Sequence, residues 1–130
     1  MPLPSEVAWY VHIERTRLRG VPVMRISGRL GVSSADSLRT ALMEGAAASN
    51  GSTSLVVDLD GVDYVSSAGL EVFESVALRL RGEGRELVLC GASDPVRLVL
   101  RFCGPRPSLV IEDSLEPALH RALQEPAASL

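Results

Sequence analysis

Two adjacent serines, Ser66 and Ser67, are the residues of this sequence whose type and spacing could do chemistry. They follow the apolar segment 54–59 and precede an apolar helical pattern that begins about residue 68. A serine at a helix start can satisfy a backbone N–H group as an N-cap, but that role needs only one hydroxyl. A phosphate on the other would meet unbonded N–H groups and the positive end of the helix dipole, adding about −1.5 to −2 charge. Our hypothesis is a phosphorylatable serine on a surface that docks another protein.

Other catalytic and nucleotide-binding motifs do not fit the sequence. A P-loop needs a glycine-rich turn that ends in Lys-Ser or Lys-Thr, and the sequence contains none. Gly82 and Gly84 follow a predicted helix instead of a strand, so they do not form a dinucleotide fingerprint. Residues 65–69 fail the Gly-x-Ser-x-Gly pattern, and neither His12 nor His120 can be placed beside a serine. An enzyme is therefore the function class that the sequence favours least.

Three carboxylates, Asp58, Asp60 and Asp63, cluster after the apolar segment and could suggest a magnesium site. We favour one strand-end carboxylate and two turn residues, because a hard cation needs convergent oxygens that spacing alone does not provide. The two cysteines and two histidines lack zinc-like spacing, and Cys90 and Cys103 fit small buried hydrophobes. We therefore expect no metal and no cofactor.

Composition and charge fit one soluble domain. The chain has 130 residues, of which 46% are hydrophobic and 22% charged. The formal net charge of −3 argues against direct nucleic-acid binding, which depends on Lys and Arg contacts to phosphates. No apolar run approaches the roughly 18–20 residues that span a bilayer, and residues 1–6 lack the features of a signal peptide. We therefore expect a cytoplasmic protein without membrane insertion.

Alternating strand and helix patterns must position the serines. Five strands are predicted, at 8–16, at 21–27, at 54–59 (continuing at 62–65), at 86–90 and at 109–111. Four helices are predicted: one that starts after Ser33 or Ser34, one from about 68 to 82, one at 96–102 and one at 115–124. Residues 28–33 are predicted as a loop, and Asp60-Gly61 as a tight turn. The order β-β-α-β-α-β-α-β-α predicts an α/β domain, with a mostly parallel central sheet, an N-terminal antiparallel hairpin and about four helices.

At these residues the sequence resembles the STAS domain family, and within it the bacterial anti-sigma factor antagonists. The resemblance is carried by residues 55–59 and 62–70, with support from 25–30 and 87–91. The predicted order of strands and helices also fits, so the resemblance covers nearly the whole chain. It implies a single STAS-like domain over residues 6–125, with residues 1–5 and 126–130 as loose tails.

The resemblance also implies a partner and a mechanism. Proteins of this kind bind an anti-sigma factor that is a serine kinase, and this binding releases a sigma factor. The kinase uses its own ATP to phosphorylate one serine, the complex separates, and a phosphatase reverses the modification. Matched residue by residue, Ser67 falls on the phosphorylated position, and Ser66 is the second candidate. A homodimer is left open.

A partner surface is expected around the serines. Its predicted members lie on the junction and on the exposed side of the following helix: Ser66, Ala68, Gly69, Glu71, Glu74 and Ser75. The small side chains at positions 68 and 69 would let a partner backbone approach closely. For each of the three helix positions, a solvated polar face is the simpler interpretation.

Two positions depart from the family pattern, because Ser66 and Gly31 stand where acidic residues are usual. Their neutrality removes negative charge and hydrogen-bond acceptors from the surroundings of Ser67. It favours a second hypothesis, a STAS-like subunit of a signalling scaffold or lipid-transport complex that is not phosphorylated. A third is a small-ligand or nucleotide-binding module that uses the helix N-terminus as an anion site.

Overall fold

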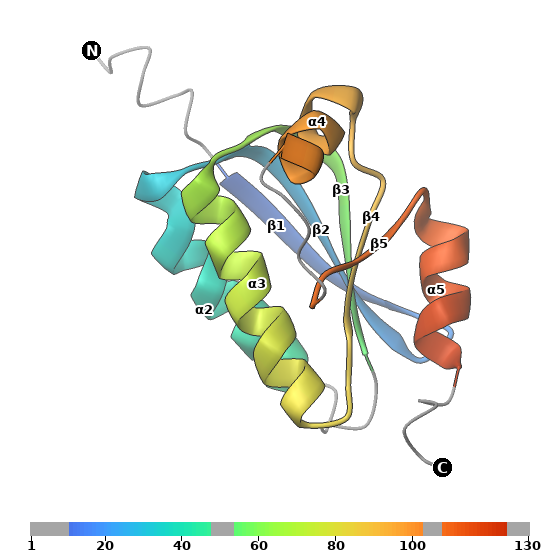
Figure 1. Cartoon of the computed structure of the whole chain (residues 1–130). Coiled ribbons are helices and arrows are strands. Elements are labelled where there is room, and N and C mark those ends of the chain that lie inside the picture. Colours follow the sequence, from blue (N-terminus) through green and yellow to red (C-terminus); the bar gives the residue numbers. More distant parts are fainter. Residues whose placement is uncertain (1–10, 48–53, 103–107, 125–130) are drawn as a thin grey trace.

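A computed structural model of the chain describes residues 11–47, 54–102 and 108–124 (Figure 1). Five strands form one sheet in the order β1 (Val11–Leu18), β2 (Val21–Leu30), β3 (Leu55–Val65), β4 (Leu87–Cys90) and β5 (Val110–Glu112). β1 is antiparallel to β2, and the other neighbouring pairs are parallel. The predicted α/β class, with its N-terminal hairpin and mostly parallel sheet, is confirmed.

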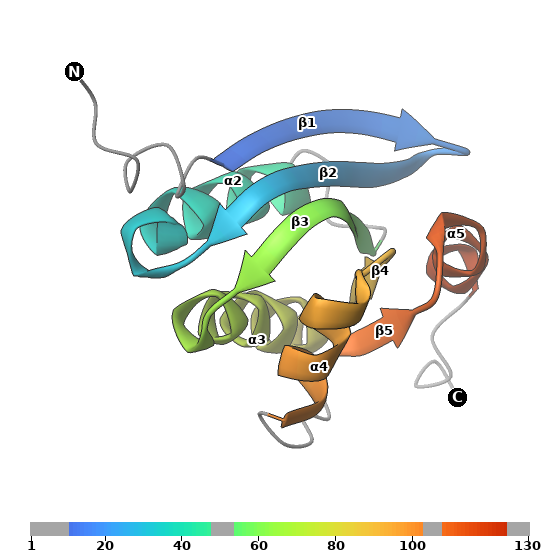
Figure 2. The same cartoon turned by 90° about the horizontal axis from the view of Figure 1, so that it is seen from above.

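Helices cover the sheet on both sides. A short 3₁₀ turn, η1 (Val32–Ser34), precedes α2 (Ala35–Ala47), and α3 (Ser67–Gly82), α4 (Asp94–Phe102) and α5 (Leu115–Leu123) follow along the chain. α2 and α3 lie on one face and α5 on the other, while α4 lies at the end toward which β3 points (Figures 1 and 2). The order β-β-α-β-α-β-α-β-α is therefore as predicted.

The first half of β3 shows why both faces are covered. Leu55, Val57 and Leu59 join the larger apolar core beneath α2 and α3, whereas Val56 joins a smaller core with α5. All four side chains are fully buried. A strand buried on both faces has no polar side to alternate with, which explains the continuous apolar segment in the sequence.

The hairpin between β1 and β2 closes through a two-residue turn. Arg19 and Gly20 both have positive φ angles, 53° and 81°, as in a type I′ turn, whose twist suits adjacent antiparallel strands. The turn lies in the gap between the strands predicted at 8–16 and 21–27, and β1 extends two residues into that gap. The pattern that predicts the first strand places Trp9 on one face with Val11 and Ile13, and Trp9 lies outside the described residues.

The predicted turn at Asp60-Gly61 is wrong, because β3 continues without a break to Val65. Its pairing with β2 instead shifts register twice, each time with one extra residue in β3. On the α2 and α3 side, the buried positions after Leu59 are therefore Val62 and Val65, three residues apart. Bulges, which add a residue to one strand, produce this spacing of three. In the sequence, the same spacing breaks the alternation expected of a strand and so suggests a turn.

The predicted loop at 28–33 is also too long, since β2 extends to Leu30. The hydroxyl of Ser34 accepts the Gly31 N–H at 3.0 Å and so stabilises η1, while α2 begins only at the next residue. Gly45 lies inside α2 because a Cβ there would collide with the sulfur of Met24 on β2. The absence of a side chain at Gly45 therefore allows α2 to pack closely on β2.

The last helix differs from its apolar pattern in one position. The spacing predicts Leu123 on one side with Leu115, Ala118 and Leu119, but Leu123 is 50% exposed, while Ala122 is buried against the smaller core. Elsewhere the predicted strands and helices agree with the structure to within a few residues at their ends. Within the described parts of the chain, no helix combines the length and apolar character that crossing a bilayer requires.

Candidate functional site

The junction between β3 and α3 is held on the sheet by backbone hydrogen bonds. Ser66 has an extended backbone (φ −88°, ψ 173°), and its N–H donates to the Leu30 carbonyl at 2.8 Å. Its own carbonyl accepts the Leu70 N–H at 3.0 Å, which begins the bonding of α3. The end of β2 therefore fixes the point at which α3 starts.

The two serines have different surroundings. Ser66 is half-buried and is the N-cap of α3, its Oγ accepting the Gly69 N–H at a long 3.4 Å. Ser67 is the first residue of the helix and is exposed. Its hydroxyl makes no hydrogen bond to any residue that the structure describes. Capping therefore occupies one serine and leaves the other facing solvent.

The small residues after the serines differ in position as well. Ala68 is half-buried, but Gly69 is buried, and a Cβ there would lie 3.2 Å from side-chain carbons of Leu30 and Val65. The small size of Gly69 thus lets α3 pack closely on the ends of β2 and β3. Of the two small residues, only Ala68 is partly exposed and could contact a partner backbone directly. Close approach of a partner to this position remains a prediction.

The predicted helix positions lie along α3, leading away from Ser67. Glu71 and Ser75 are exposed, and Glu74 is half-buried. Ser75 is joined to α2, because its Oγ accepts a hydrogen bond from Arg39 Nη1 at 3.1 Å. The structure therefore places all three on one helix, while their role in partner binding remains a prediction.

Three further residues lie at this end of the sheet and were assigned no role from the sequence. The guanidinium carbon of Arg29 lies 5.1 Å from the centre of the Tyr64 ring, within cation–π range. Tyr64 is 37% exposed, and Val32, on η1, is 81% exposed. One sequence signal indicates these residues, since they lie within or next to segments 25–30 and 62–70, which carry the family resemblance. Their proximity depends on a strand register that the sequence did not reveal.

The predicted carboxylate cluster is spread along β3. Asp58 has a side chain only 13% exposed; its Oδ1 accepts the Asp60 N–H at 3.0 Å, and its Oδ2 lies 3.7 Å from Arg25 Nε. Asp60 and Asp63 are exposed. Across the described parts of the chain, no three His, Cys, Asp or Glu side chains are grouped so as to hold a metal ion. The carboxylate of Asp58 thus interacts with the Asp60 N–H and with Arg25.

Cys90 is paired with Asp58 across the sheet and is fully buried. Burial, together with the nearby Asp58 carboxylate, raises the pKa of its thiol to about 12, and Arg25 opposes this shift only in part. The thiol therefore stays protonated at neutral pH and has little nucleophilic character. Cys103 lies outside the described residues.

Known proteins resemble the chain in sequence and in fold. Residues 12–118 match the sequence model of the family described as STAS domain. BtrV of Bordetella bronchiseptica, whose name assigns it provisionally as an anti-sigma factor antagonist, is 33% identical over 102 residues, which is 78% of this chain and 86% of BtrV.

Two solved structures share the fold. An anti-sigma factor antagonist from Mycobacterium paratuberculosis superposes with a TM-score of 0.78 at 21% identity, covering 95% of this chain and all of that one. The anti-sigma factor antagonist SpoIIAA in its unphosphorylated form gives 0.62 at 22% identity, covering 85% and 95% of the two chains. At such identities the likeness concerns the fold alone.

Proposed function

The chain belongs to the STAS domain family, and from this membership we propose that it is a non-enzymatic anti-sigma factor antagonist of the cytoplasm. Its partner is an anti-sigma factor of the serine-kinase type, and binding releases a sigma factor. Phosphorylation of Ser67 by the kinase, with the kinase's own ATP, ends the complex, and a phosphatase restores binding. The name of BtrV, which is 33% identical over most of both chains, supports this function.

One observation carries the choice of Ser67: it is the exposed first residue of α3, while Ser66 is occupied as the cap. The first N–H groups of a helix have no acceptor within the helix, and the helix dipole adds a positive potential there. A phosphate on Ser67 is therefore stabilised in the free protein. The same phosphate would have to lose water to fit beneath a docked partner, which weakens the complex.

The neutral residues around Ser67 affect the switch in a definite direction. The first turn of α3 contains no acidic residue, and Ser66 and Gly31 carry no charge. A phosphate here consequently meets less repulsion than it would beside carboxylates. Before phosphorylation, this surface is also less negative than it would be with acids at those two positions, so the phosphate makes a larger relative change in local charge.

A phosphorylation assay with matched serine variants tests the proposal. The purified chain is incubated with ATP and, in turn, each kinase-type anti-sigma factor of its source organism, and tryptic peptides are weighed. We expect one phosphate on the unaltered chain, none on Ser67→Ala, and one on Ser66→Asn, because Asn also caps helices well. Full phosphorylation of Ser67→Ala would move the site elsewhere, and an unmodified wild-type chain would remove the switch.

A second candidate function is favoured by Ser66 and Gly31, the two neutral residues at usually acidic positions. It is a subunit of a signalling scaffold or lipid-transport complex that is not phosphorylated. Affinity capture from the native cell extract compares the unaltered chain with Ser67→Asp. Loss of one kinase-like partner in the variant supports the antagonist, whereas retention of a transporter ATPase or sensor complex by both supports the subunit.

A further inference from the structure

Helix α4 presents large apolar side chains to solvent. Leu98 is 49% exposed and Phe102 is 83% exposed, and their spacing of four residues places them side by side on the helix. Within α4 only Val96 is fully buried, whereas Val99 and Leu100 are half-buried. A helix with apolar residues on most of its sides is normally covered by protein. The described part of the chain therefore leaves apolar surface of α4 without a cover.

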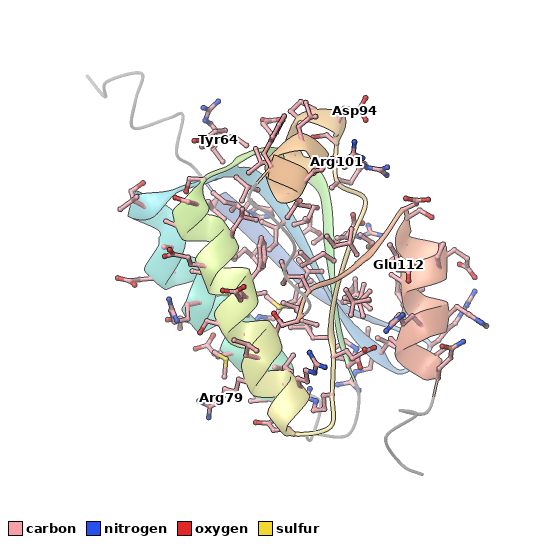
Figure 3. The ribbon with its side chains drawn as sticks, in the orientation of Figure 1. Tyr64, Arg79, Asp94, Arg101 and Glu112 are labelled. Atoms are coloured by element: carbon pink, nitrogen blue, oxygen red, sulfur yellow. The ribbon has the colours of Figure 1, made fainter. Side chains whose placement is uncertain are left out.

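Two opposite charges flank this apolar surface. Asp94 begins α4 and Arg101 lies in its last turn, and both are exposed. The two residues are about 10 Å apart along the helix, and Leu98 lies close to midway between them. Neither charged side chain has an ion pair or a hydrogen bond with any residue that the structure describes. Figure 3 shows both on the outer side of α4, away from Tyr64.

We propose that this surface binds a second copy of the chain, with the two α4 helices antiparallel about a two-fold axis near Leu98. The α4 surface is defined as Asp94, Leu98, Arg101 and Phe102. Each Leu98 then packs on Leu98 of the other copy, and each Asp94 lies beside Arg101 of the other copy. The inference goes beyond the proposed function, because it concerns how the chain assembles with itself.

The order of the charges along α4 selects the antiparallel arrangement. With the helices antiparallel, the acid at the start of each helix meets the arginine near the end of the other, so two equivalent ion pairs form. Parallel helices would bring like charges together at both ends, which opposes binding. The helix dipoles act in the same direction, since each positive N-terminus then lies beside a negative C-terminus. The α4 surface is therefore complementary to itself, as two-fold symmetry requires.

The third charged residue of α4 is held by its own chain. Arg97 Nε donates to the Ala92 carbonyl at 2.9 Å, and Arg97 Nη1 lies 3.6 Å from the Asp113 carboxylate. Arg97 therefore adds no unbalanced charge to the α4 surface. The balance between Asp94 and Arg101 is what a second copy meets.

The position and length of α4 define the kind of dimer. The helix lies outermost at its end of the molecule, so a second copy reaches it without first meeting another helix (Figures 1 and 2). Its nine residues span only about 13 Å, so the contact is small. Small interfaces belong to weak and transient complexes. We therefore expect a dimer that forms at high concentration and separates on dilution.

Sedimentation equilibrium of the purified chain from about 1 µM to about 1 mM tests this inference. We expect a monomer–dimer equilibrium for the unaltered chain. Leu98→Ser removes the central apolar contact and should raise the dissociation constant of the dimer at least about tenfold. Leu123→Ser changes an equally exposed leucine on α5 and should alter that constant less than about twofold.

Reversing the charges tests the pairing itself. Asp94→Arg leaves two cations on the α4 surface and Arg101→Asp leaves two anions, so each variant alone should dimerise at least about tenfold more weakly. When the two variants are mixed, they should form a heterodimer, because each cation then meets an anion of the other chain. The double variant should regain dimerisation for the same reason. Such recovery requires that Asp94 lies beside Arg101 of another copy.

Thermal unfolding first shows that each variant is folded, and Asp94→Asn and Arg101→Gln replace any charge reversal that does not fold. These neutral variants should also weaken the dimer, by a smaller factor. A chain that stays monomeric at about 1 mM overturns the inference, as does a dimer that Leu98→Ser and the charge variants leave unchanged. The measurement uses the chain alone, so neither result affects the proposed antagonist function.

Discussion

The two halves of β3 differ although they belong to one unbroken strand. Residues 56–58 pair with β2 on one side, and residues 55–58 pair with β4 on the other, where the pairing ends at Asp58. Beyond it, the strand pairs with β2 through two bulges and carries the exposed residues Asp60, Asp63 and Tyr64. Regular pairing thus coincides with burial, and irregular pairing with the exposed stretch that leads to the two serines.

This difference shows how one strand can hold a fold together and also present a surface. In the first half, side chains alternate between two apolar layers. In the second half, every third side chain, at Val62 and Val65, reaches the larger core. The two residues before each of them are exposed, so the share of exposed positions is higher than in the first half. The strand therefore changes function along its length without ending, and each half should respond differently to substitution.

The largest expected effect comes from truncating buried Leu55, compared with exposed Tyr64. Leu55→Ala should lower the free energy of unfolding by about 2–5 kcal/mol, because it leaves a cavity in the larger core. Tyr64→Ala should cost less than about 1 kcal/mol, as is usual away from the core. Urea denaturation of each variant measures the loss. Equal losses of stability would contradict the division of β3.

A pair of glycines sharpens the comparison at the first bulge. A Cβ at Gly61 would lie 2.6 Å from the Ser27 Cβ and 3.2 Å from its Cα, whereas at Gly82, near the end of α3, it would meet nothing within 4 Å. Gly61→Ala should therefore cost about 1–3 kcal/mol through overpacking. Gly82→Ala serves as the control and should be neutral or slightly stabilising. A neutral Gly61→Ala in urea denaturation would mean that β2 and β3 are not packed this tightly.

The boundary between the halves should respond to alkaline pH through Cys90, which faces Asp58. The unfolded thiol ionises near 9.0 and the folded thiol only near 12, so stability from this group is intact below pH 9 and lost as pH rises toward 12. The loss should reach about 1.4 kcal/mol per pH unit at most. All thirteen basic residues other than histidine are Arg, so no Lys titrates in this range.

Denaturant unfolding of the unaltered chain and Cys90→Ala at pH 7, 9 and 10.5 measures this effect. The variant starts from a lower stability because of its smaller side chain, but its decline above pH 9 should be shallower. Parallel declines in the two proteins would show that Cys90 is not the responsible group.

The sequence predicts the parts of this fold that depend on local pattern. The apolar residues of α3, among them Leu70, Phe73 and Leu80, recur at helical spacing and are buried as predicted. The order of strands and helices along the chain follows because strand and helix patterns alternate in the sequence. The position of the two serines follows from the same pattern, since they stand between a buried strand and an amphipathic helix.

Features that depend on register were beyond the sequence pattern. The spacing of Leu59, Val62 and Val65 is compatible with a turn or with bulges, and only pairing with β2 decides between them. The contact of Arg29 with Tyr64 depends on the same pairing. Likewise, the buried position of Gly69 depends on how closely α3 approaches Leu30. Each of these features depends on the distance between segments that are far apart in the sequence, and local residue propensities do not determine that distance.

The bulge at Asp63 has a consequence for how such domains diverge in evolution. Buried apolar side chains are concentrated in the regular half of β3, so substitutions at the exposed residues beyond it, such as Asp63, cost the fold little and pass the stability threshold that eliminates most core mutations. Gene duplication can then yield copies with one shared core and different surface charges. Several such switches could thereby operate in one cell with little cross-talk, each matched to its own partner.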